Sequence, residues 1–558
     1  MCGIWARIGE QPPNESVEYY VNKLKARGPE GSSVKRSWNC SLGFTRLAIN
    51  GLTDAGMQPM TFGNCSYVCN GEIYNWKELS KKYNVESESG SDCEVLGELW
   101  EKFANVGSGS VFFQNLDGVF AIVLADSASN HVYVARDPYG VRPLFVGYKF
   151  GEAEETANPD KTYIQDGSGT LIPIVSLYFA SEMKALLLCD HIEVFPPGHC
   201  AAYNMKTLAR TGFEPFHIVP WLKNPLLSIE EEATKSLRYA LEKAVEKRLM
   251  TDRPIAALLS GGLDSSLVAA LVQSSLKKAG KPSLKTFSIG FENSEDLRCA
   301  KIVADYIGSD HTEVVMTPDD FFDAIPDVIK DIESYDITTV RASVGNWLIS
   351  KVISETTDCK VVFNGDGSDE VFGGYKYFYN SPSEEAFEAE SARLLKDIHY
   401  FDVLRSDRCI SSHGLEARTP FLDKEFVSVG RSIATALRLP TAAILEKSIL
   451  RKSFIGLLPD SILWRKKEAF SDGVSGKDKA WYEICKEKAE KIVEDTMPWQ
   501  ARALLQKYTH LPPKTAEAYY YRWLFEKNYG KKFETVTVPY YWMPKWSNTE
   551  DPSARTLS

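Results

Sequence analysis

The sequence has no long hydrophobic run. Its longest apolar stretches, around Val119–Ala125 and Leu171–Ala180, are the length of strands, whereas a bilayer-spanning helix needs about 18 or more apolar residues. Residues Met1–Glu10 also lack a basic flank followed by an apolar core, so we expect no signal peptide. These two absences predict a protein without a membrane partner.

Cysteine is scarce as well. The chain has 11 cysteines among 558 residues, an odd and scattered set without a CxxC pair. This excludes a disulfide-framed scaffold, and Cys65 and Cys69 lack the companions of a zinc site. We therefore expect reduced thiols and a cytoplasmic protein.

The chain also lacks an excess of basic residues. Lys and Arg total 64 against 75 Asp and Glu, which gives a net charge of −11. A general nucleic-acid binder needs a basic footprint, so no nucleic-acid partner is expected. Hydrophobic residues at 44% and charged residues at 25% are instead typical of an ordinary globular chain.

Two segments of different character follow one another. The first part, residues 2–205, has many short β-type runs and a helical pattern at Ser181–Leu188, which predicts a layered α+β domain. Residues 206–227 carry three prolines and are interpreted as a linker. The first strongly helical pattern after it begins at Ser228, which forms a predicted capping box with Glu231.

Residues 228–546 alternate between strand and helix patterns, which predicts a parallel sheet covered by helices, with a mostly helical part beyond about residue 380. Residues 547–558 are interpreted as a polar tail. The predicted strands and helices are, in chain order, Ile255–Leu259, Leu263–Lys278, Thr286–Ile289, Asp296–Ile307, Thr312–Met316 and Lys360–Phe363.

The sharpest motif of this second domain is SGGLDSS at Ser260–Ser266, between a strand and a helix. Two glycines allow the backbone to approach an anion, and the helix N-terminus supplies unpaired N–H groups. A plain glycine-rich turn is the alternative. The motif resembles the pyrophosphate loop of ATP pyrophosphatases.

A second turn, Phe363–Glu370, follows the next apolar strand and holds three acids, Asp366, Asp369 and Glu370. Acids this close repel one another unless a cation offsets them, and Mg²⁺–pyrophosphate is a natural partner. A solvated acidic loop is the alternative, but ligands of such sheets gather at the strands' carboxyl ends.

The first domain begins Met1-Cys2-Gly3-Ile4. Once Met1 is removed, Cys2 would carry both a thiol nucleophile and a free α-amino group, whose pKa of about 7.7–8.0 suits a general base. An incidental second-position cysteine is the alternative.

Four further segments lie in the first hundred residues. They are Arg27-Gly28-Pro29, Gly43–Ile49, Asn70–Asn75 and Gly90–Glu94. Arg46 could pair with a substrate α-carboxylate, and Glu72 or Asp92 could hold an α-ammonium. Asn70 and Gly71 could form an oxyanion hole, although Asn-Gly also favours a plain hairpin turn.

The ordered set MCGI, RGP, RLAI, NGEIYN and SDCE resembles the class II glutamine amidotransferase domain, an N-terminal-nucleophile hydrolase. Followed by SGGLDSS, YDITTVRAS (335–343), NGDGSDEVFGGY (364–375), HGLEARTPFLD (413–423) and KEAFSDGV (467–474), it resembles the glutamine-hydrolysing asparagine synthetases over nearly the whole chain. The fold that this implies is a layered αββα domain followed by an α/β parallel-sheet domain of the ATP-pyrophosphatase type with a helical C-terminal part.

The resemblance implies two reactions. Cys2 hydrolyses glutamine through a thioester and releases ammonia; separately, aspartate and MgATP form β-aspartyl-AMP and pyrophosphate. Ammonia passes through an internal tunnel to the adenylate and yields asparagine and AMP. ATP as substrate, Mg²⁺ and a homodimer are part of the same expectation.

Residue roles are carried over from the family's motifs. The expected catalytic residues are Cys2, Asn70, Gly71, Asp366 and Lys467. Glutamine would be bound by Arg46, Leu47, Ala48, Ile49, Asn50, Asn70, Gly71, Glu72 and Asp92. ATP would be bound by Leu258, Ser260, Gly261, Gly262, Asp264, Ser265, Ser266, Ile289, Asn364 and Gly365. The aspartate site or tunnel end would include Thr338, Thr339, Arg341, Asp402 and Arg405, and Mg²⁺ would bind Asp264 and Asp369.

The chain departs from the family pattern at four positions. Ala26 stands where His is frequent, Glu30 follows Arg-Gly-Pro in place of Asp, Asn364 replaces a common Ser, and Asp366 replaces a common Glu. None removes an obligatory chemical group, so these departures bear on fine specificity and rate.

Three alternatives remain open at this point. A ring-closing synthetase of the β-lactam type would need no ammonia, which the intact Cys2, Arg46 and Asn70–Glu72 argue against. An amidotransferase acting on a sugar phosphate or phosphoribosyl pyrophosphate would lack the Ser260–Ser266 loop. A non-catalytic protein with an enzyme's fold is the third.

Overall fold

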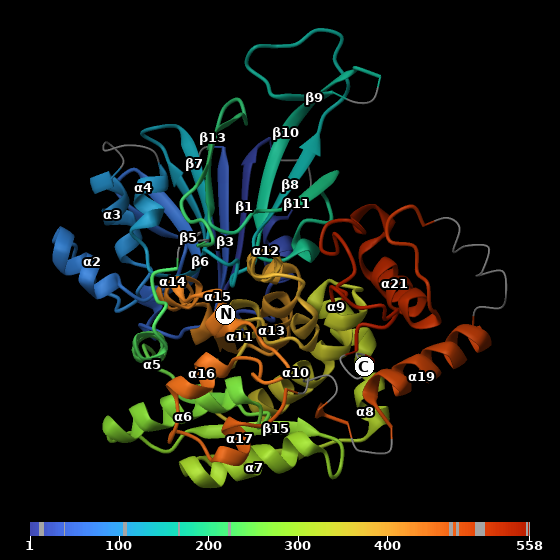
Figure 1. The fold of residues 1–558 in the computed structure, drawn as a ribbon. Coiled ribbons are helices and arrows are strands. Elements are labelled where there is room, and N and C mark those ends of the chain that lie inside the picture. The colour runs from blue at the N-terminus through green and yellow to red at the C-terminus, as the bar shows by residue number, and fades with distance from the viewer. Residues whose placement is uncertain are drawn as a thin grey trace. The chain divides into compact units, whose positions relative to one another are not determined.

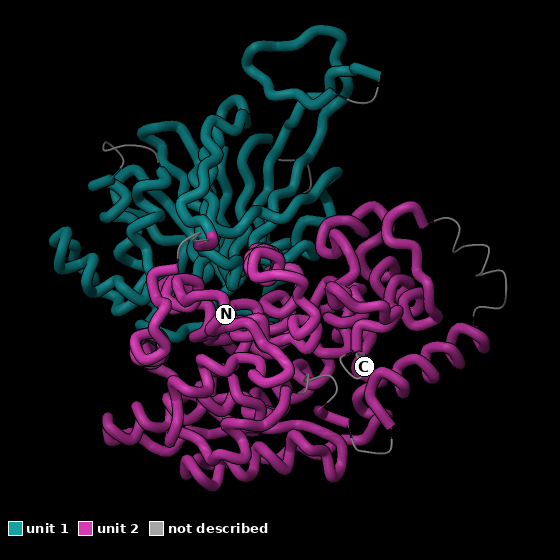
Figure 2. The backbone as a smooth tube through the Cα atoms, in the orientation of Figure 1, with its two compact units in different colours: residues 1–218 teal, residues 219–558 magenta. Residues whose placement is uncertain are grey.

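The computed structural model describes residues 1–10, 16–37, 39–103, 109–165, 168–220, 225–467, 473–475, 479–496, 508–553 and 556. Three stretches named above fall partly outside it: residues 221–224 of the predicted linker, residues 468–472 of the motif that begins at Lys467, and residues 554, 555, 557 and 558 of the predicted polar tail. The chain divides into two compact units, residues 1–218 and 219–558 (Figure 2). Strand β13 (Arg210–Pro215) lies within the segment interpreted as a linker, and the predicted domain boundaries stay a prediction.

Unit 1 contains two antiparallel sheets (Figure 1). In spatial order the first sheet consists of β11 (His191–Val194), β8 (Phe145–Phe150), β10 (Leu171–Ala180), β1 (Gly3–Gly9), β3 (Cys40–Arg46) and β2 (Gly31–Ser37), with β9 (Tyr163–Gln165) paired to β10. The second consists of β13, β12 (His199–Asn204), β7 (His131–Arg136), β6 (Gly118–Asp126), β5 (Cys65–Ile73) and β4 (Met60–Phe62).

The core of unit 1 lies between these sheets. Ile4 and Ala6 of β1 and Phe179 of β10 share one buried cluster with Val123 of β6 and Val134 of β7. Alternate residues of each strand point inward, which is why apolar residues recur at every second position of β1. Helix α1 (Val17–Asn22) packs on the first sheet, and the helices on the second are α2 (Trp76–Tyr83), α3 (Val95–Phe103) and α4 (Gly109–Gln114). This is the predicted layered αββα arrangement.

One local prediction for unit 1 was wrong. The helical pattern at Ser181–Leu188 forms only a single 3₁₀ turn, Met183–Ala185. Because β10 and β11 both pair with β8, the connection must cross between them, and its apolar side chains Met183, Ala185 and Leu186 are buried in the core rather than aligned along a helix.

Unit 2 is built on one five-stranded sheet, in which every adjacent pair is parallel. Its order is β16 (Asp310–Val315), β15 (Lys285–Gly290), β14 (Ile255–Leu258), β17 (Val361–Phe363) and β18 (Glu416–Arg418). Parallel strands are buried on both faces, which explains the nearly continuous apolar runs of β14 and β17. The central position of β14 places the loop that follows it at the middle of the carboxyl edge.

Helices surround this sheet and make up most of the C-terminal half (Figure 1). Helices α6 and α7 contact each other and neighbouring strands, and α10 packs against β15. The helices of unit 2 are α5 (Glu230–Arg248), α6 (Leu263–Lys278), α7 (Glu295–Ile307), α8 (Pro318–Asp323), α9 (Ile325–Ile332), α10 (Ile337–Thr356), α11 (Ser368–Phe372), α12 (Glu384–Asp397), α13 (Asp402–Ser411), α14 (Lys424–Ser432), α15 (Thr435–Arg438), α16 (Ser448–Ser453), α17 (Asp460–Leu463), α19 (Trp481–Thr496) and α21 (Ala516–Tyr529).

The ends of two of these helices, α7 and α5, show different local chemistry. Helix α7 begins after the Ser294 cap and ends at Gly308, whose φ of 71° suits glycine. The capping box predicted at Ser228 is absent: α5 is capped at Ile229 without a side-chain hydrogen bond. Three glutamates, Glu230–Glu232, occupy its first turn and complement the helix dipole instead.

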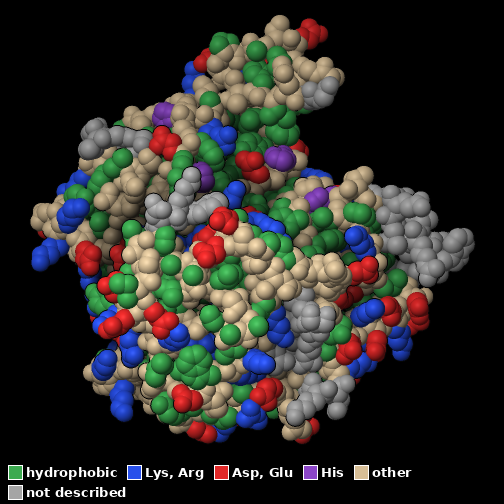
Figure 3. Space-filling view, in the orientation of Figure 1, with side chains coloured by type: hydrophobic (Ala, Val, Ile, Leu, Met, Phe, Trp, Pro, Cys, Tyr) green, Lys and Arg blue, Asp and Glu red, His purple; other side chains and the backbone are tan. Residues whose placement is uncertain are grey.

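Among the described residues, no helix combines the length and the apolarity that a membrane crossing requires. On the face shown in Figure 3, Lys and Arg side chains are interspersed with Asp and Glu, in keeping with the nearly balanced charge of the sequence.

Candidate active sites

In unit 1, Cys2 lies immediately before the central strand β1. Its Sγ is 3.4 Å from the Leu47 backbone nitrogen and 3.5 Å from the Leu47 carbonyl oxygen, just beyond the end of β3. Arg27 donates to the Cys2 carbonyl at 2.9 Å and forms a buried ion pair with Glu182, also at 2.9 Å. Met1 is buried beside Arg142. The Cys2 thiol thus lies against the Leu47 backbone, and the Arg27 guanidinium fixes the Cys2 carbonyl group.

The glycine of Arg27-Gly28-Pro29 is required by close backbone contact. A Cβ on Gly28 would lie 2.2 Å from the Thr45 carbonyl carbon. Glu30, the next residue, ties this turn to the segment that follows β3, because its Oε2 accepts from the Ala48 N–H at 2.7 Å. Glu30, one of the departures from the family pattern, therefore holds the backbone that leads to Asn50.

Arg46 is buried, and its guanidinium donates to the carbonyls of Gly51 (2.6 Å) and Thr53 (2.7 Å). Its predicted role, pairing with the α-carboxylate of glutamine, stays a prediction. In this structure the side chain organises the loop through those two carbonyls.

Three predicted glutamine-site residues come together on one side of this loop. The Asn50 Nδ2 donates to Glu72 Oε2 at 2.6 Å and lies 3.5 Å from Asp92 Oδ1. Asp92 Oδ2 also accepts from the Ile73 N–H at 2.7 Å. Two buried carboxylates and an amide oxygen form a setting suited to a substrate ammonium group.

Asn70 is fully buried on β5, and among the described residues neither side-chain atom of its amide has a hydrogen-bond partner. Leaving such a group unsatisfied costs about 1–3 kcal/mol, so it signals a bound ligand or water. The adjacent Gly71 cannot carry a side chain, because a Cβ would lie 2.2 Å from the Val119 carbonyl oxygen. An amide without a partner beside the backbone N–H of a glycine is the combination of groups expected of an oxyanion hole.

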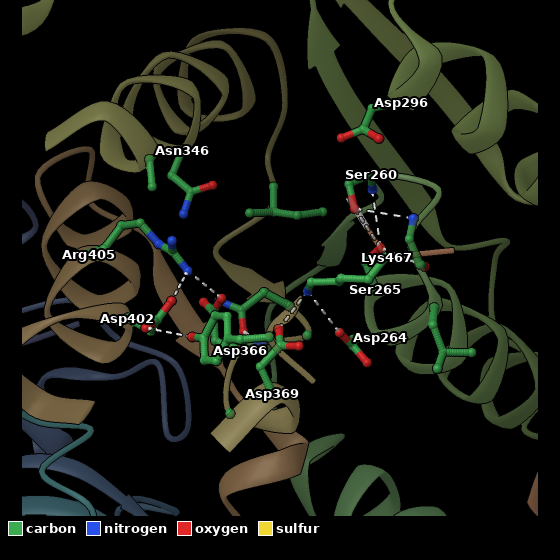
Figure 4. A pocket seen from close by; sticks show the side chains of 18 of the residues that line it. Ser260, Asp264, Ser265, Asp296, Asn346, Asp366, Asp369, Asp402, Arg405 and Lys467 are labelled. Carbon is green, nitrogen blue, oxygen red and sulfur yellow. Dashed lines mark hydrogen bonds and ion pairs between the residues drawn. The ribbon is translucent and has the colours of Figure 1, made fainter. Parts of the chain in front are cut away.

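Unit 2 contains a cavity at the carboxyl edge of its sheet (Figure 4). All but three of the residues predicted for the synthetase site line it. The exceptions are Gly261, which turns the loop with φ 70°, Ser266, which is fully buried at the start of α6, and Arg341. Fifteen of the 36 residues that line this cavity were thus predicted from the sequence.

The loop after β14 is tied together by its own hydroxyl groups. Ser265 Oγ lies 3.2 Å from the Ser260 N–H and 3.0 Å from the Ser260 Oγ. Helix α6 then begins at Leu263, with Asp264 in its first turn. Backbone N–H groups at a helix start, hydroxyl donors and two glycines form an anion-binding arrangement.

The acidic turn after β17 lies directly against this loop. A Cβ on Gly365 would be 2.7 Å from the Ser265 nitrogen and 2.9 Å from the Asp264 carbonyl carbon. Asn364 donates through Nδ2 to Ser406 Oγ at 2.5 Å and accepts from the Asp366 N–H at 3.3 Å. The amide of Asn364 therefore stabilises the turn on which the acids sit.

Two lysines neutralise the acids nearest the loop. Lys447 Nζ lies 2.6 Å from both Asp264 Oδ2 and Asp369 Oδ1, and Lys467 Nζ lies 2.7 Å from Asp369 Oδ2. Burial alone would raise the pKa of Asp369, but the two ammonium groups outweigh it and hold this pKa well below its usual range. The Asp369 carboxylate is therefore ionised.

Asp366 and its neighbours form a second charged group, drawn in Figure 4. Arg405 lies 2.9 Å from Asp366 Oδ1 and 2.8 Å from Asp402 Oδ1, and Tyr375 donates to Glu370 at 2.5 Å. Burial raises the pKa of Asp366, with Arg405 offsetting part of that effect. Burial together with Asp402 and Asp369 raises the pKa of Glu370 well above its usual value.

Arg341 is the predicted residue whose surroundings differ most from expectation. Its guanidinium pairs with Glu517 at 2.6 Å and with Asp551 at 2.8 Å. It is buried behind the cavity wall, whereas Thr338 and Thr339, one turn earlier on α10, line the cavity. The predicted polar tail thus supplies Asp551 as a partner of Arg341.

Sequence reasoning missed several cavity residues, among them Lys447, Glu446, Arg465 and Asn346. Arg465 donates to the Gly261 carbonyl at 3.1 Å and pairs with Asp296 at 3.0 Å. None lies in a glycine-rich motif, so the signal that exposed the two loops did not mark them.

Comparison with known families defines the class of protein. The model of the Glutamine amidotransferase domain matches residues 1–214, and that of the Asparagine synthase family matches residues 236–390 and 379–535. The chain thus joins a glutamine amidotransferase to a synthetase, which confirms the predicted fold class.

Full-length relatives make the assignment more specific. Asparagine synthetase [glutamine-hydrolyzing] of Cricetulus griseus is 42% identical over 589 aligned residues, which cover 100% of this chain and 99% of that protein. The proteins of the same name from Rattus norvegicus and Homo sapiens are 42% and 41% identical with the same coverage. The chain belongs to the family of glutamine-hydrolysing asparagine synthetases, as the motifs predicted.

Proposed function

We propose that this enzyme makes asparagine from aspartate and ATP, with the amide nitrogen of glutamine as its nitrogen source, through a β-aspartyl-AMP intermediate. The observation that carries the proposal is the unit 2 cavity, where the Ser260–Ser266 loop and the Asn364–Glu370 turn meet. Family membership argues against the ring-closing and sugar-phosphate alternatives, which use other acceptors.

In unit 1 the Cys2 thiolate would attack the side-chain carbonyl carbon of glutamine. The Asn70 amide and the Gly71 N–H would stabilise the negative oxygen of the tetrahedral intermediate. Ammonia would leave, and water would release glutamate from the thioester. After removal of Met1, the Cys2 α-amino group would accept and return the proton.

In unit 2 a β-carboxylate oxygen of aspartate would attack the α-phosphorus of ATP and displace pyrophosphate. The α6 N-terminus and the hydroxyl groups of Ser260 and Ser265 would bind phosphate oxygens. Ammonia would then attack the β-carbonyl carbon and release AMP. Asp366, with its raised pKa, lies where a base could accept the proton that the attacking ammonia loses.

The residues present fit a magnesium ion. Asp264 Oδ1 is buried and has no hydrogen-bond partner among the described residues, and Asp369 faces the same lysine as Asp264. Within the described parts of the chain no group of three or more His, Cys, Asp and Glu side chains forms a metal site. The pair of carboxylates suits Mg²⁺, which protein kinases and ATPases hold by one or two carboxylates plus substrate phosphates. Asp264 and Asp369 would hold the ion, which would neutralise charge on the departing pyrophosphate.

A cytoplasmic location is part of the proposal, supported by eleven free cysteines. The homodimer and the internal passage for ammonia rest on the family resemblance alone. Sedimentation of the purified enzyme would test the first.

The experiment is product identification. Incubation with ATP, Mg²⁺, aspartate and glutamine should yield asparagine, glutamate, AMP and pyrophosphate in equal amounts. Formation of ADP and phosphate would overturn the adenylation step. An absence of all products from folded enzyme would instead favour the non-catalytic alternative.

A further inference from the structure

Lys447 stands in the position that the proposed function gives to the metal ion. Its Nζ lies 2.6 Å from Asp264 Oδ2 and 2.6 Å from Asp369 Oδ1, so one ammonium bridges both carboxylates. Only 1% of the Lys447 side chain is exposed. Asp264 belongs to the first turn of α6, Asp369 to helix α11, and Lys447 is the residue before α16, so three distant segments meet at this nitrogen.

The fold is specifically shaped to hold the lysine there. The backbone of Lys447 has a φ of 59°, in the left-handed region that non-glycine residues rarely adopt. Opposite it, a Cβ on Gly374 would lie 2.1 Å from Lys447 Cε and 2.1 Å from Asp369 Oδ1. The left-handed backbone of Lys447 and the absence of a side chain at Gly374 are both needed to bring this ammonium between the two acids.

The ammonium and a metal ion exclude each other at this place. Magnesium binds carboxylate oxygens at about 2.0–2.1 Å and requires near-octahedral space around it. A nitrogen bridging the same two oxygens fills that space. Removing the ammonium without replacement would leave two half-buried carboxylates repelling each other, with Lys467 at 2.7 Å from Asp369 but 4.0 Å from Asp264.

We propose that Lys447 is a cation placeholder: in the enzyme without nucleotide it occupies the gap between Asp264 and Asp369 and prevents a free divalent cation from binding there. The metal enters only together with the nucleotide, whose phosphates supply the missing ligands. Phosphate oxygens also accept the displaced ammonium, which its flexible four-carbon stem allows. This inference rests on the proposed metal role of the two aspartates.

The test is a titration with Mn²⁺ alone, followed by the electron paramagnetic resonance signal of the free ion. Wild-type enzyme without nucleotide should show no saturable site in unit 2. Lys447→Met should gain one site that binds Mn²⁺ roughly tenfold or more tighter than any in the wild type. The double variant Lys447→Met with Asp369→Asn should lose that site again.

Lys376 offers a matched control. It lines the same cavity, and no ion pair joins it to either aspartate among the described residues. Lys376→Met removes the same charge from the cavity and should gain no Mn²⁺ site. If Lys376→Met gained as much Mn²⁺ affinity as Lys447→Met, the gain would come from the loss of any positive charge in the cavity, and the proposal would be overturned.

The remaining outcomes also decide it. Equal Mn²⁺ binding by wild type and Lys447→Met, or no gain in a Lys447→Met protein that melts cooperatively, would overturn the placeholder role. If Lys447→Met does not fold, Lys447→Gln keeps a hydrogen-bond donor and takes its place. A titration with Mn²⁺ in the presence of ATP, on wild type and on Asp369→Asn, tests the proposed metal site separately from the placeholder role. If Mn²⁺ binding depends on Asp369, the proposed metal site stands even if the placeholder role fails. If Mn²⁺ binding does not depend on Asp369, the proposed metal site is refuted as well.

Discussion

Gly365 is the point where the two loops of the synthetase cavity touch, and its replacement by alanine tests that contact. The added Cβ would lie 2.7 Å from the Ser265 nitrogen and 2.9 Å from the Asp264 carbonyl carbon. Both atoms belong to backbone, so no side-chain rotation relieves the contact. Since unstrained carbon contacts lie at about 3.5–4.0 Å, the loops must separate by roughly 0.5–1 Å.

A shift of this size displaces the helix start and hydroxyl groups that would hold the phosphates. Misplacement by about 1 Å can cost about 100-fold in rate, which is the expected loss in kcat/KM for ATP. Pyrophosphate release with ammonium as the nitrogen source measures it. Glutamine hydrolysis should remain near the wild-type rate, because Gly365 belongs to unit 2.

Gly212 supplies the control for this substitution. A Cβ there would meet nothing nearer than the Ala202 Cβ at 3.8 Å, so Gly212→Ala should leave both activities unchanged. Wild-type pyrophosphate release by Gly365→Ala would refute the conclusion that the two loops form one phosphate-binding site.

Three other predictions concern separate parts of the chain. Cys2→Ala should abolish glutamine-dependent synthesis and keep ammonium-dependent synthesis; parallel loss of both in folded enzyme would contradict two independent sites. Arg341→Met should lower the free energy of unfolding by about 3–5 kcal/mol, since it leaves the buried Glu517 without its cation. Asp551→Asn should lower it far less, because the Asp551 side chain is 29% exposed. Equal melting temperatures for the two variants would count against this difference. Burial opposes ionisation of Asp423, but Arg248 and Lys247 hold its pKa at about 2, below the usual 3.8. Its depressed pKa stabilises the fold above about pH 4, and that stabilisation, about 2 kcal/mol, is lost as pH falls toward 2. The stability difference between wild type and Asp423→Asn should therefore shrink over this range in acid melts, and a constant difference would contradict the assignment.

Local sequence signals predicted the framework of unit 2 well. Helix α6 spans Leu263–Lys278 as its pattern indicates, and β14, β15 and α7 lie within a residue or two of expectation. Glycine-rich turns between apolar strands and amphipathic helices are encoded by neighbouring residues, so the Ser260–Ser266 loop could be placed at the sheet edge. The prediction at Ser181–Leu188 was wrong because tertiary packing overrode a short local pattern.

Partners supplied by distant segments could not be predicted. Asp551 meets Arg341 across 210 residues, and Lys447 reaches Asp264 across 183. Lys447 lies in a stretch that contains no glycine, so nothing in the sequence indicates the left-handed conformation of its backbone. For the same reason the unsatisfied amide of Asn70 became visible only once β5 and its neighbours were in place.

The central claim is that aspartate is activated on its β-carboxylate by adenylation, and isotope transfer tests this most directly. Aspartate labelled with ¹⁸O in the β-carboxylate would be incubated with ATP, Mg²⁺ and ammonium, and the nucleotide and phosphate products analysed by mass spectrometry. The account predicts one ¹⁸O atom in the phosphate of AMP and none in pyrophosphate. Label in inorganic phosphate, together with ADP, would contradict it.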